Sequence, residues 1–446
     1  MTTPPLTRRT FLQTAAVAAV AATRSSAAQT RPPASERIAV AAIGLGERGF
    51  AVLNEFLHEP DVQVVAVCDV HEWHYREREW GKGKPLGRKP AQQMVDAHYA
   101  SLTKSGIANG CRAYSDFRDV CQRDDIDAVL VATPDHWHAL ITLAALRSGK
   151  DVYCEKPVTH WFAEGQQVCR EVASRKAILQ VGSQQRSDAK FRQAVELVRN
   201  GWLGNVQRVE VGLPPGYTQP MGDPAVVAVP EGLDYDLWCG PSAVLPYMKA
   251  RHHRWWRGHT AYGGGVLMDF IGHNNDIAHW GLGEEAGGPV SVEAVGWKYP
   301  DTKVYDTPAD YAIHCRYANG VTSIISNQFP VGAKWIGENG WVFVTRGKIS
   351  CSDMRWEDPA FRRGDWRAYE SPGHVRNFLD GVKARKECVA PAENAHRAIT
   401  PGHLAYVSQS LGKPLRWDPV AEQIPDHPEA QQKLLALPYR APWSLI

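Results

Sequence analysis

Asp269 and His273 stand four residues apart, shortly after three consecutive glycines at 263–265. On a helix, positions i and i+4 share one face, so the carboxylate and the imidazole would project side by side. A neutral imidazole accepts a proton, and a neighbouring carboxylate is expected to raise its basicity toward the working pH. The pair therefore predicts general acid–base chemistry, the alternative being a capping acid beside a core histidine. No third ligand follows at a recognisable spacing, so we expect no metal.

A second chemical pattern is a glycine motif near the start of the chain. Gly44, Gly46 and Gly49 form GxGxxG directly after the apolar run 37–43, where a buried strand would pass into a helix. Such glycines let the backbone approach a pyrophosphate at a helix N-terminus. Asp69 follows Gly49 by twenty positions, the separation at which a carboxylate can bind ribose hydroxyls. This pattern predicts a dinucleotide, with NAD favoured over NADP. The alternative is a glycine-rich turn without a ligand.

Strands and helices that would position these residues alternate in the first part of the chain. Apolar runs predict buried strands, and the stretches between most of them are compatible with helices. Alternation of this kind predicts a parallel, doubly wound sheet. The expected strands are 37–43, 61–70, 128–132 and 151–154, and the expected helices are 50–58, 91–104 and 138–148.

Beyond Pro157 the pattern changes to helices at 161–176 and 188–200, followed by several strands in succession, which predicts a mostly antiparallel sheet. These strands are expected at 206–213, 290–297, 311–317, 321–328 and 341–344. The stretch 214–265 is rich in glycine, proline and aromatic residues, and it is too long for a simple connector, so we expect it to cover a site. The fold class is thus α/β, with a Rossmann domain at 37–157 and a second α/β domain at 158–446.

Four segments resemble the Gfo/Idh/MocA oxidoreductases, the group of glucose–fructose oxidoreductase and inositol dehydrogenase, over about residues 37–446. The segments are Glu155-Lys156-Pro157, Ala132-Thr133-Pro134-Asp135-His136-Trp137-His138, Gly182-Ser183-Gln184-Gln185-Arg186-Ser187 and the glycine-rich approach to Asp269 and His273. Late segments at 415–419 and 440–443 are similar to members that carry twin-arginine signals. Many of those relatives have a second histidine where this chain has Asn274.

The resemblance implies a Rossmann half followed by a half with an open, mostly antiparallel sheet, often used for oligomer contacts. It also implies that Lys156 reaches the reacting centre and that the Lys156–Pro157 bond is cis. The roles of the individual residues follow from the motifs and the resemblance together. The catalytic set is Lys156, Asp269 and His273; the cofactor set is Gly44, Gly46, Glu47, Arg48, Gly49, Asp69, Thr133, Pro134, His138, Glu155, Lys156 and Gln184; the substrate set is Arg186, Trp255, Trp256 and Asn274.

The reaction we expect is hydride transfer between a sugar or polyol carbon and NAD, with His273 as the base, Lys156 stabilising the alkoxide and Asp269 orienting or balancing charge. The basic, aromatic run 251–259 would line the substrate entrance, or would be a solvated loop with two buried tryptophans. Two other functions stay open. One is glycoside hydrolysis through transient oxidation by a tightly held, recycled NAD, and the other is a sensor that binds the dinucleotide without chemistry.

The N-terminus predicts export. Thr7-Arg8-Arg9-Thr10-Phe11-Leu12 precedes a short apolar stretch and the small residues at 26–28, which resembles a twin-arginine signal, with a linker at 29–36. The apolar stretch is too short for a membrane anchor. We therefore expect a periplasmic or otherwise exported protein that uses the twin-arginine machinery. The family resemblance, in addition, implies a homo-oligomer.

The overall charge excludes other classes of partner. The chain has 50 basic and 48 acidic residues, a net charge of +2, and residues 1–28 contribute three arginines and no acid. Such a balance does not indicate nucleic acid or an anionic membrane. The nine cysteines contain no CxxC pair, so neither a disulfide framework nor structural zinc is expected.

Overall fold

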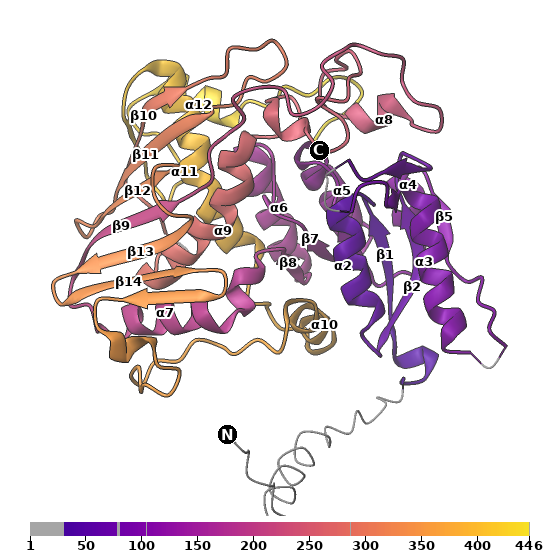
Figure 1. Cartoon of the computed structure of the whole chain (residues 1–446), viewed down its shortest axis with the longest axis horizontal. Coiled ribbons are helices and arrows are strands. Elements are labelled where there is room, and N and C mark those ends of the chain that lie inside the picture. The colour runs from indigo at the N-terminus through magenta and orange to yellow at the C-terminus, as the bar shows by residue number, and fades with distance from the viewer. Residues whose placement is uncertain (1–30, 78–80, 104, 286, 446) are drawn as a thin grey trace, which may run out of the picture.

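The computed structural model describes residues 31–77, 81–103, 105–285 and 287–445. Two β-sheets stand at opposite sides of the molecule with helices packed around and between them (Figure 1). One sheet is parallel, and the other is mixed and mostly antiparallel. The predicted α/β class, a parallel Rossmann sheet followed by an open, mostly antiparallel sheet, is confirmed.

The parallel sheet has the strand order β5-β2-β1-β6-β7-β8, which is doubly wound. Its apolar strands are buried on both faces. In β1, Val40 and Ala42 pack with α2, α3 and α10 (His374–Ala384), whereas Ala41 and Ile43 pack with α4, α5 and α6. The elements are β1 (Ile38–Ile43), α2 (Glu47–Leu57), β2 (Val62–Cys68), the short pair β3 (His74–Tyr75) and β4 (Pro85–Leu86), α3 (Arg88–Ser101), β5 (Arg112–Tyr114), α4 (Phe117–Cys121), β6 (Ala128–Val131), α5 (Asp135–Arg147), β7 (Asp151–Cys154), α6 (Phe162–Arg175) and β8 (Leu179–Val181).

The cofactor half extends further than the expected boundary at Pro157. β8 follows that proline and pairs in parallel with β7. In addition, α10 (His374–Ala384) returns from the second half, and its buried Phe378 and Leu379 join the core beneath β1 and α2. Pairing and burial therefore assign to the first half two elements that the sequence reading placed in the second.

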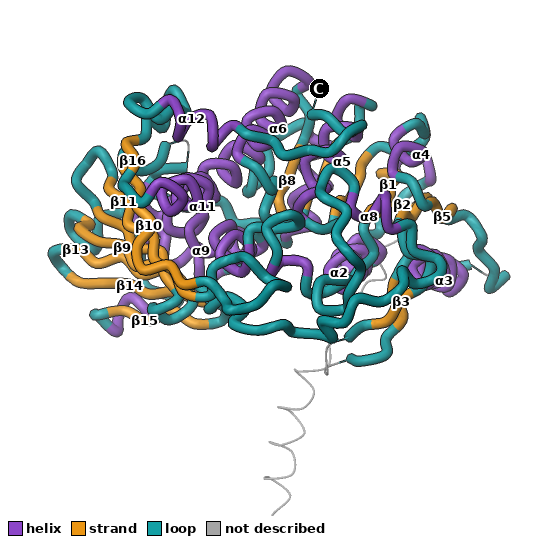
Figure 2. Tube along the Cα trace, turned by 90° about the horizontal axis from the view of Figure 1, so that it is seen from above, coloured by secondary structure: helices purple, strands orange, loops and turns teal. Residues whose placement is uncertain are grey.

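The second sheet has eight strands in the order β15-β14-β13-β9-β12-β11-β10-β16. Only β9 and β12 pair in parallel, and the end strands β15 and β16 do not pair with each other, so the sheet is open. Figures 1 and 2 show α9 and α11 between this sheet and the parallel one. The elements are α7 (Ala189–Arg199), β9 (Val206–Gly212), α8 (Tyr235–Cys239), α9 (Gly265–Leu282), β10 (Ser291–Lys298), β11 (Asp310–Arg316), β12 (Thr322–Ser326), β13 (Gly332–Gly337), β14 (Gly340–Thr345), β15 (Lys348–Cys351), α11 (Ala392–Leu411), β16 (Leu415–Arg416) and α12 (Pro428–Leu435).

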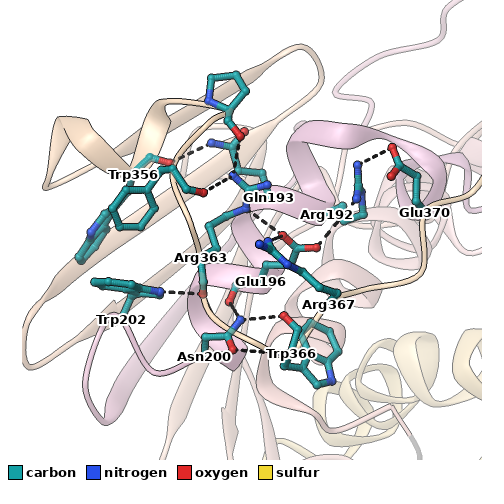
Figure 3. A network of polar contacts seen from close by, with 12 residues as sticks. Arg192, Gln193, Glu196, Asn200, Trp202, Trp356, Arg363, Trp366, Arg367 and Glu370 are labelled. Atoms are coloured by element: carbon teal, nitrogen blue, oxygen red, sulfur yellow. Dashed lines mark hydrogen bonds and ion pairs between the residues drawn. The ribbon is translucent and has the colours of Figure 1, made fainter.

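A buried polar network fixes the segment after β15 onto α7 (Figure 3). The carboxylate of Glu196 on α7 accepts from Arg363 Nε at 2.8 Å and from Arg367 Nη1 at 2.9 Å. One turn earlier, Gln193 Nε2 donates to the carbonyl oxygen of Trp356 at 2.9 Å. Because Glu196 is fully buried, its charge requires these cationic partners.

The predicted export signal, residues 1–28, lies outside the described residues. The described part of the predicted linker packs on the cofactor half, where Arg31 Nη2 donates to the carbonyl oxygen of Val62 at 2.6 Å. No described helix combines the length and the apolar character needed to cross a bilayer.

Candidate active site

A cavity of about 750 Å³ opens at the carboxyl ends of the parallel strands, where the two halves meet. Open α/β sheets bind ligands at this edge, next to the point where the strand order reverses. The predicted long cover contributes, because Trp238, Arg254 and Trp256 from 214–265 line the wall. Predicted cofactor residues that follow β1, β2, β6 and β7 line the cavity, namely Gly44, Asp69, Thr133 and Glu155. Asp269 and His273 line it from α9.

The glycine turn after β1 has the shape of a dinucleotide cradle. Gly44 has a φ of 86°, and a Cβ there would lie 2.5 Å from the backbone nitrogen of Thr133. A Cβ on Gly49 would lie 1.9 Å from the carbonyl oxygen of Gly44. Gly46, in contrast, has no atom within 4 Å of a Cβ position, although it lines the cavity at the start of α2. The turn is therefore compact on its protein side and open on its cavity side, as a bound pyrophosphate requires.

Asp69 lies at the end of β2 and is held by the backbone. Its Oδ2 accepts from Leu45 N at 2.6 Å, and its Oδ1 accepts from His71 N at 2.8 Å. Burial raises the pKa of this carboxyl, which these two hydrogen bonds partly offset. The side chain thereby links the glycine turn to the next loop while it still lines the cavity.

Glu155 and Arg48 form an ion pair on the wall of the same cavity. Arg48 Nε donates to Glu155 Oε1 at 2.8 Å, and Gln184 Nε2 donates to the same oxygen at 3.1 Å. Glu47, the first residue of α2, lies 3.5 Å from Arg76 Nη2 and also lines the cavity. The predicted cofactor residues of three separate segments are thus brought together.

The Thr133–Pro134 loop and the Lys156–Pro157 bond are tied together by His138. Its Nδ1 lies 2.6 Å from Pro157 O and its Nε2 lies 2.9 Å from Thr133 O, and burial lowers the pKa of the ring. The Lys156–Pro157 bond is cis, as the resemblance implies. Thr133, Pro134, His138 and Lys156 all line the cavity.

Lys156 meets Asp269 at the first turn of α9. Its Nζ donates to the backbone oxygen of Asp269 at 3.0 Å and forms an ion pair with the carboxylate. Arg257 Nε lies 3.1 Å from the same carboxylate oxygen. Burial alone would raise the pKa of Asp269, but Arg257 and Lys156 outweigh it and hold that pKa below its usual range. Lys156 and Arg257 therefore share one ionised carboxylate.

His273 lies one turn further along α9 and lines the cavity. Burial lowers the pKa of the ring well below 6.5, and the positive charges of Lys156 and Arg346 lower it further. Asp269 raises the pKa of His273, as expected from the sequence, but burial and these cations outweigh that carboxylate, so the net shift of the pKa is downward. The ring is consequently neutral and able to accept a proton at neutral pH.

The structure places only some of the predicted substrate residues at the cavity. Trp256 lines the cavity, and the guanidinium of Arg257 stacks 4.1 Å from its ring centre. Trp255 is not part of the lining. Asn274 points toward the second sheet, where its Nδ2 donates to Gly212 O at 2.7 Å. Arg186 is buried in ion pairs with Asp276 at 2.7 Å and Glu285 at 3.0 Å, a position that argues against substrate contact.

Three further residues at or beside the site were missed as site residues by the sequence reading. Arg257 stands in the basic run noted above, but nothing in that run singles it out. Asp135 belongs to the Thr-Pro-Asp motif; burial raises its pKa to about 8, and neither of its oxygens has a hydrogen-bond partner among the described residues. Arg346 lies on the turn between β14 and β15, where no sequence motif marks it.

Comparison with known families identifies both halves. Residues 188–445 match the model of the oxidoreductase family's C-terminal alpha/beta domain, and residues 83–183 match its NAD-binding Rossmann fold. The chain therefore belongs to the Gfo/Idh/MocA oxidoreductases, and its first half is that family's NAD-binding domain.

Curated relatives match over part of the chain. A glycosyl hydrolase family 109 protein of Saccharopolyspora erythraea is 32% identical over 171 residues, which are 34% of this chain and 34% of the relative. A protein of the same name from Shewanella putrefaciens is 30% identical over 129 residues, 28% of this chain and 24% of its own. The chain thus spans about a third or less of the length of these relatives.

Solved structures share the fold over most of the chain. The WlbA dehydrogenase of Bordetella pertussis, in complex with NADH and UDP-GlcNAcA, aligns with a TM-score of 0.60 at 17% identity, covering 86% of this chain and 99% of that one. The aldose–aldose oxidoreductase of Caulobacter crescentus, complexed with glycerol, aligns with a TM-score of 0.58 at 18% identity, covering 85% and 99%.

Proposed function

We propose that this protein is an NAD-dependent oxidoreductase that acts on a hydroxyl-bearing carbon of a sugar, polyol or glycoside. The observation that carries the proposal is the meeting of Lys156, Asp269 and His273 in one cavity with the glycine cradle. Gly44, Gly46, Asp69 and the paired Arg48 and Glu155 would hold the dinucleotide, which supplies an acceptor for the hydride when bound.

His273 removes the proton of the substrate hydroxyl, because its ring is neutral and faces the cavity. Lys156 stabilises the negative charge that develops on that oxygen. Asp269 keeps Lys156 in place through the ion pair and limits the positive charge around it together with Arg257. The buried Trp238 and Trp256, which line the cavity from the segment 214–265, would shield the reaction from water.

We further propose that the dinucleotide leaves slowly. The loop that follows Asp69 is held by the second half: Glu72 N donates to Gly232 O at 3.0 Å, and Asp234 N donates to Val70 O at 3.0 Å. On the same loop, His71 Nδ1 lies 2.7 Å from His253 Nε2. These contacts hold the loop beside Asp69, where the ribose would bind.

A retained dinucleotide also favours a second function, namely glycoside hydrolysis in which the substrate is oxidised, loses its leaving group and is reduced again. The curated relatives named as glycosyl hydrolase family 109 proteins support this reading. A sensor without chemistry is the less favoured function, because Lys156, Asp269 and His273 are all present.

Export by a twin-arginine signal in residues 1–28, a periplasmic location and a homo-oligomer are also proposed. The sequence of the signal supports the first two, and the open second sheet is compatible with the third. Fusion of residues 1–36 to a folded reporter, followed by cell fractionation, tests the export proposal.

Nucleotide content and a substrate panel test the function. Freshly purified protein is denatured, the released nucleotide is quantified, and native protein is then incubated with sugars, polyols and glycosides. NADH that accumulates with a sugar or polyol supports the dehydrogenase. Bound NAD in equal amount to the protein, with glycoside cleavage and no free NADH, supports the recycling hydrolase. Protein that neither contains nor binds NAD contradicts both.

A further inference from the structure

Arg346 occupies the turn of the β14–β15 hairpin, far from His273 in sequence but on the wall of the same cavity. Gly347, with a φ of 75°, makes this turn tight and leaves the arginine at its tip. The side chain of Arg346 is exposed to solvent at the cavity.

Most of the other cations of the cavity wall have a carboxylate partner. Lys156 and Arg257 share Asp269, Arg48 pairs with Glu155, and Arg254 stacks on an indole, with its guanidinium 5.1 Å from the ring centre. Among the described residues, Arg346 has no hydrogen bond, ion pair or ring contact.

Arg346 acts on the reacting end of the cavity. After burial and Lys156, its charge is the next cause that lowers the pKa of His273. Asp188 lines the same cavity, but its carboxylate accepts from Lys190 N at 2.7 Å as the cap of α7, and among the described residues no ion pair joins it to Arg346.

The hairpin has a fixed position. β14 pairs with β13 and β15, and the segment after β15 is anchored on α7 by Gln193 and Glu196 (Figure 3). A guanidinium on a fixed turn can bind an anion with little loss of backbone freedom, and its planar fork matches a carboxylate or a phosphate.

We propose that Arg346 is a specificity-determining residue that binds an anionic group of the substrate, so that the preferred substrates are acidic sugars bearing a carboxylate or a phosphate. This inference rests on the proposed function and names the substrate class of the same site. Such a substrate also offsets the positive charge of Lys156 and Arg346 around His273, and it thereby favours proton transfer to the ring.

Binding by NAD-loaded protein tests this proposal. The probes are matched neutral and acidic sugars: glucose, glucuronate and glucose 6-phosphate; galactose and galacturonate; mannose and mannuronate. Their dissociation constants are measured by calorimetry for the wild type, Arg346→Gln and the control Lys348→Gln, which changes an exposed lysine on the same hairpin outside the cavity lining.

We expect at least one acidic probe to bind the wild type more tightly than its neutral partner. Arg346→Gln should weaken that probe about 10- to 100-fold, the usual strength of hydrogen bonds to a charged group, and leave the neutral sugar and the NAD content unchanged. Lys348→Gln should change none of these values. Tighter binding of the uronates would identify the anionic group as a carboxylate, and tighter binding of glucose 6-phosphate would identify it as a phosphate.

The proposal is overturned if no acidic probe binds the wild type more tightly than its neutral partner, or if both variants weaken the acidic probe equally. Its failure is distinct from failure of the proposed function. Sugars that reduce NAD, together with acidic probes that bind no more tightly than their neutral partners, would leave the function standing without this inference. Binding of an acidic probe that depends on Arg346, without reduction of NAD by any substrate, would support the anion site and contradict the proposed function.

Discussion

Replacing Asp269 by asparagine probes how one carboxylate stabilises both the fold and the site. The side chains of Asp269, Lys156 and Arg257 are only 15%, 13% and 18% exposed. Loss of one partner of a buried ion pair typically destabilises a protein by about 3 to 5 kcal/mol, since a charge is left buried without compensation. Because these side chains line the cavity and are partly exposed to water, we expect a destabilisation near the lower end of this range.

A loss of about 3 kcal/mol corresponds to a decrease in Tm of roughly 6 °C, at about 2 °C per kcal/mol for a domain of this size. Scanning calorimetry of NAD-free protein measures it. The control is Glu429→Gln, which removes a surface pair with Lys433 at 3.7 Å whose side chains are 63% and 44% exposed, and which should cost less than about 0.5 kcal/mol.

A double-mutant cycle sharpens this test. Lys156→Met in the Asp269→Asn background removes one of the two uncompensated cations, so the double variant should be more stable than the sum of the single changes predicts. Equal changes in Tm for Asp269→Asn and Glu429→Gln, or strictly additive changes for the double variant, would refute the role assigned to the carboxylate.

Three other predictions concern the cofactor and the base. Gly49→Ala should destabilise the NAD-free protein by about 1 to 3 kcal/mol, because the new Cβ would lie 1.9 Å from Gly44 O. Gly46→Ala should leave the Tm nearly unchanged but weaken NAD binding at least about tenfold, because its Cβ would face the cavity. Calorimetry measures the first effect, and NAD titration measures the second. The acidic limb of kcat/KM against pH should lie well below pH 6.5, since His273 accepts a proton only while neutral and activity is lost as pH falls through its lowered pKa; a limb at or above 6.5 would contradict this assignment. His253→Ala should speed the release of bound NAD, measured by dilution into a dinucleotide scavenger, without changing the sugar specificity, and an unchanged release rate would show that the loop contact does not retain NAD.

Local patterns in the sequence were enough to predict the first strand and the glycine turn of the cofactor half, but not its β8 and α10. The strand β1 is a continuous apolar run, and the glycine turn follows it directly, so both are set by neighbouring residues. Asp269 and His273 share a helix, and the i, i+4 spacing placed them on one face without knowledge of the fold.

Longer-range features were not predictable in the same way. α11 was missed; it contains Pro401 in its interior, a residue that usually ends a helix, and tertiary packing maintains it here. Arg186 lies within a motif but pairs with Asp276 of α9, a contact that only the folded chain reveals. Arg346 reaches the cavity because the second sheet brings its hairpin there, and no local pattern encodes that approach.

The most direct test of the central claim is the absorbance at 340 nm when NAD-loaded protein is rapidly mixed with a substrate from the panel. The account predicts a rise, lasting for a dehydrogenase and transient for a recycling hydrolase. His273→Gln should suppress the rise by about 10² to 10⁴ in rate while keeping its bound NAD. Product formation with no change at 340 nm, and at the same rate in NAD-free protein, would contradict it.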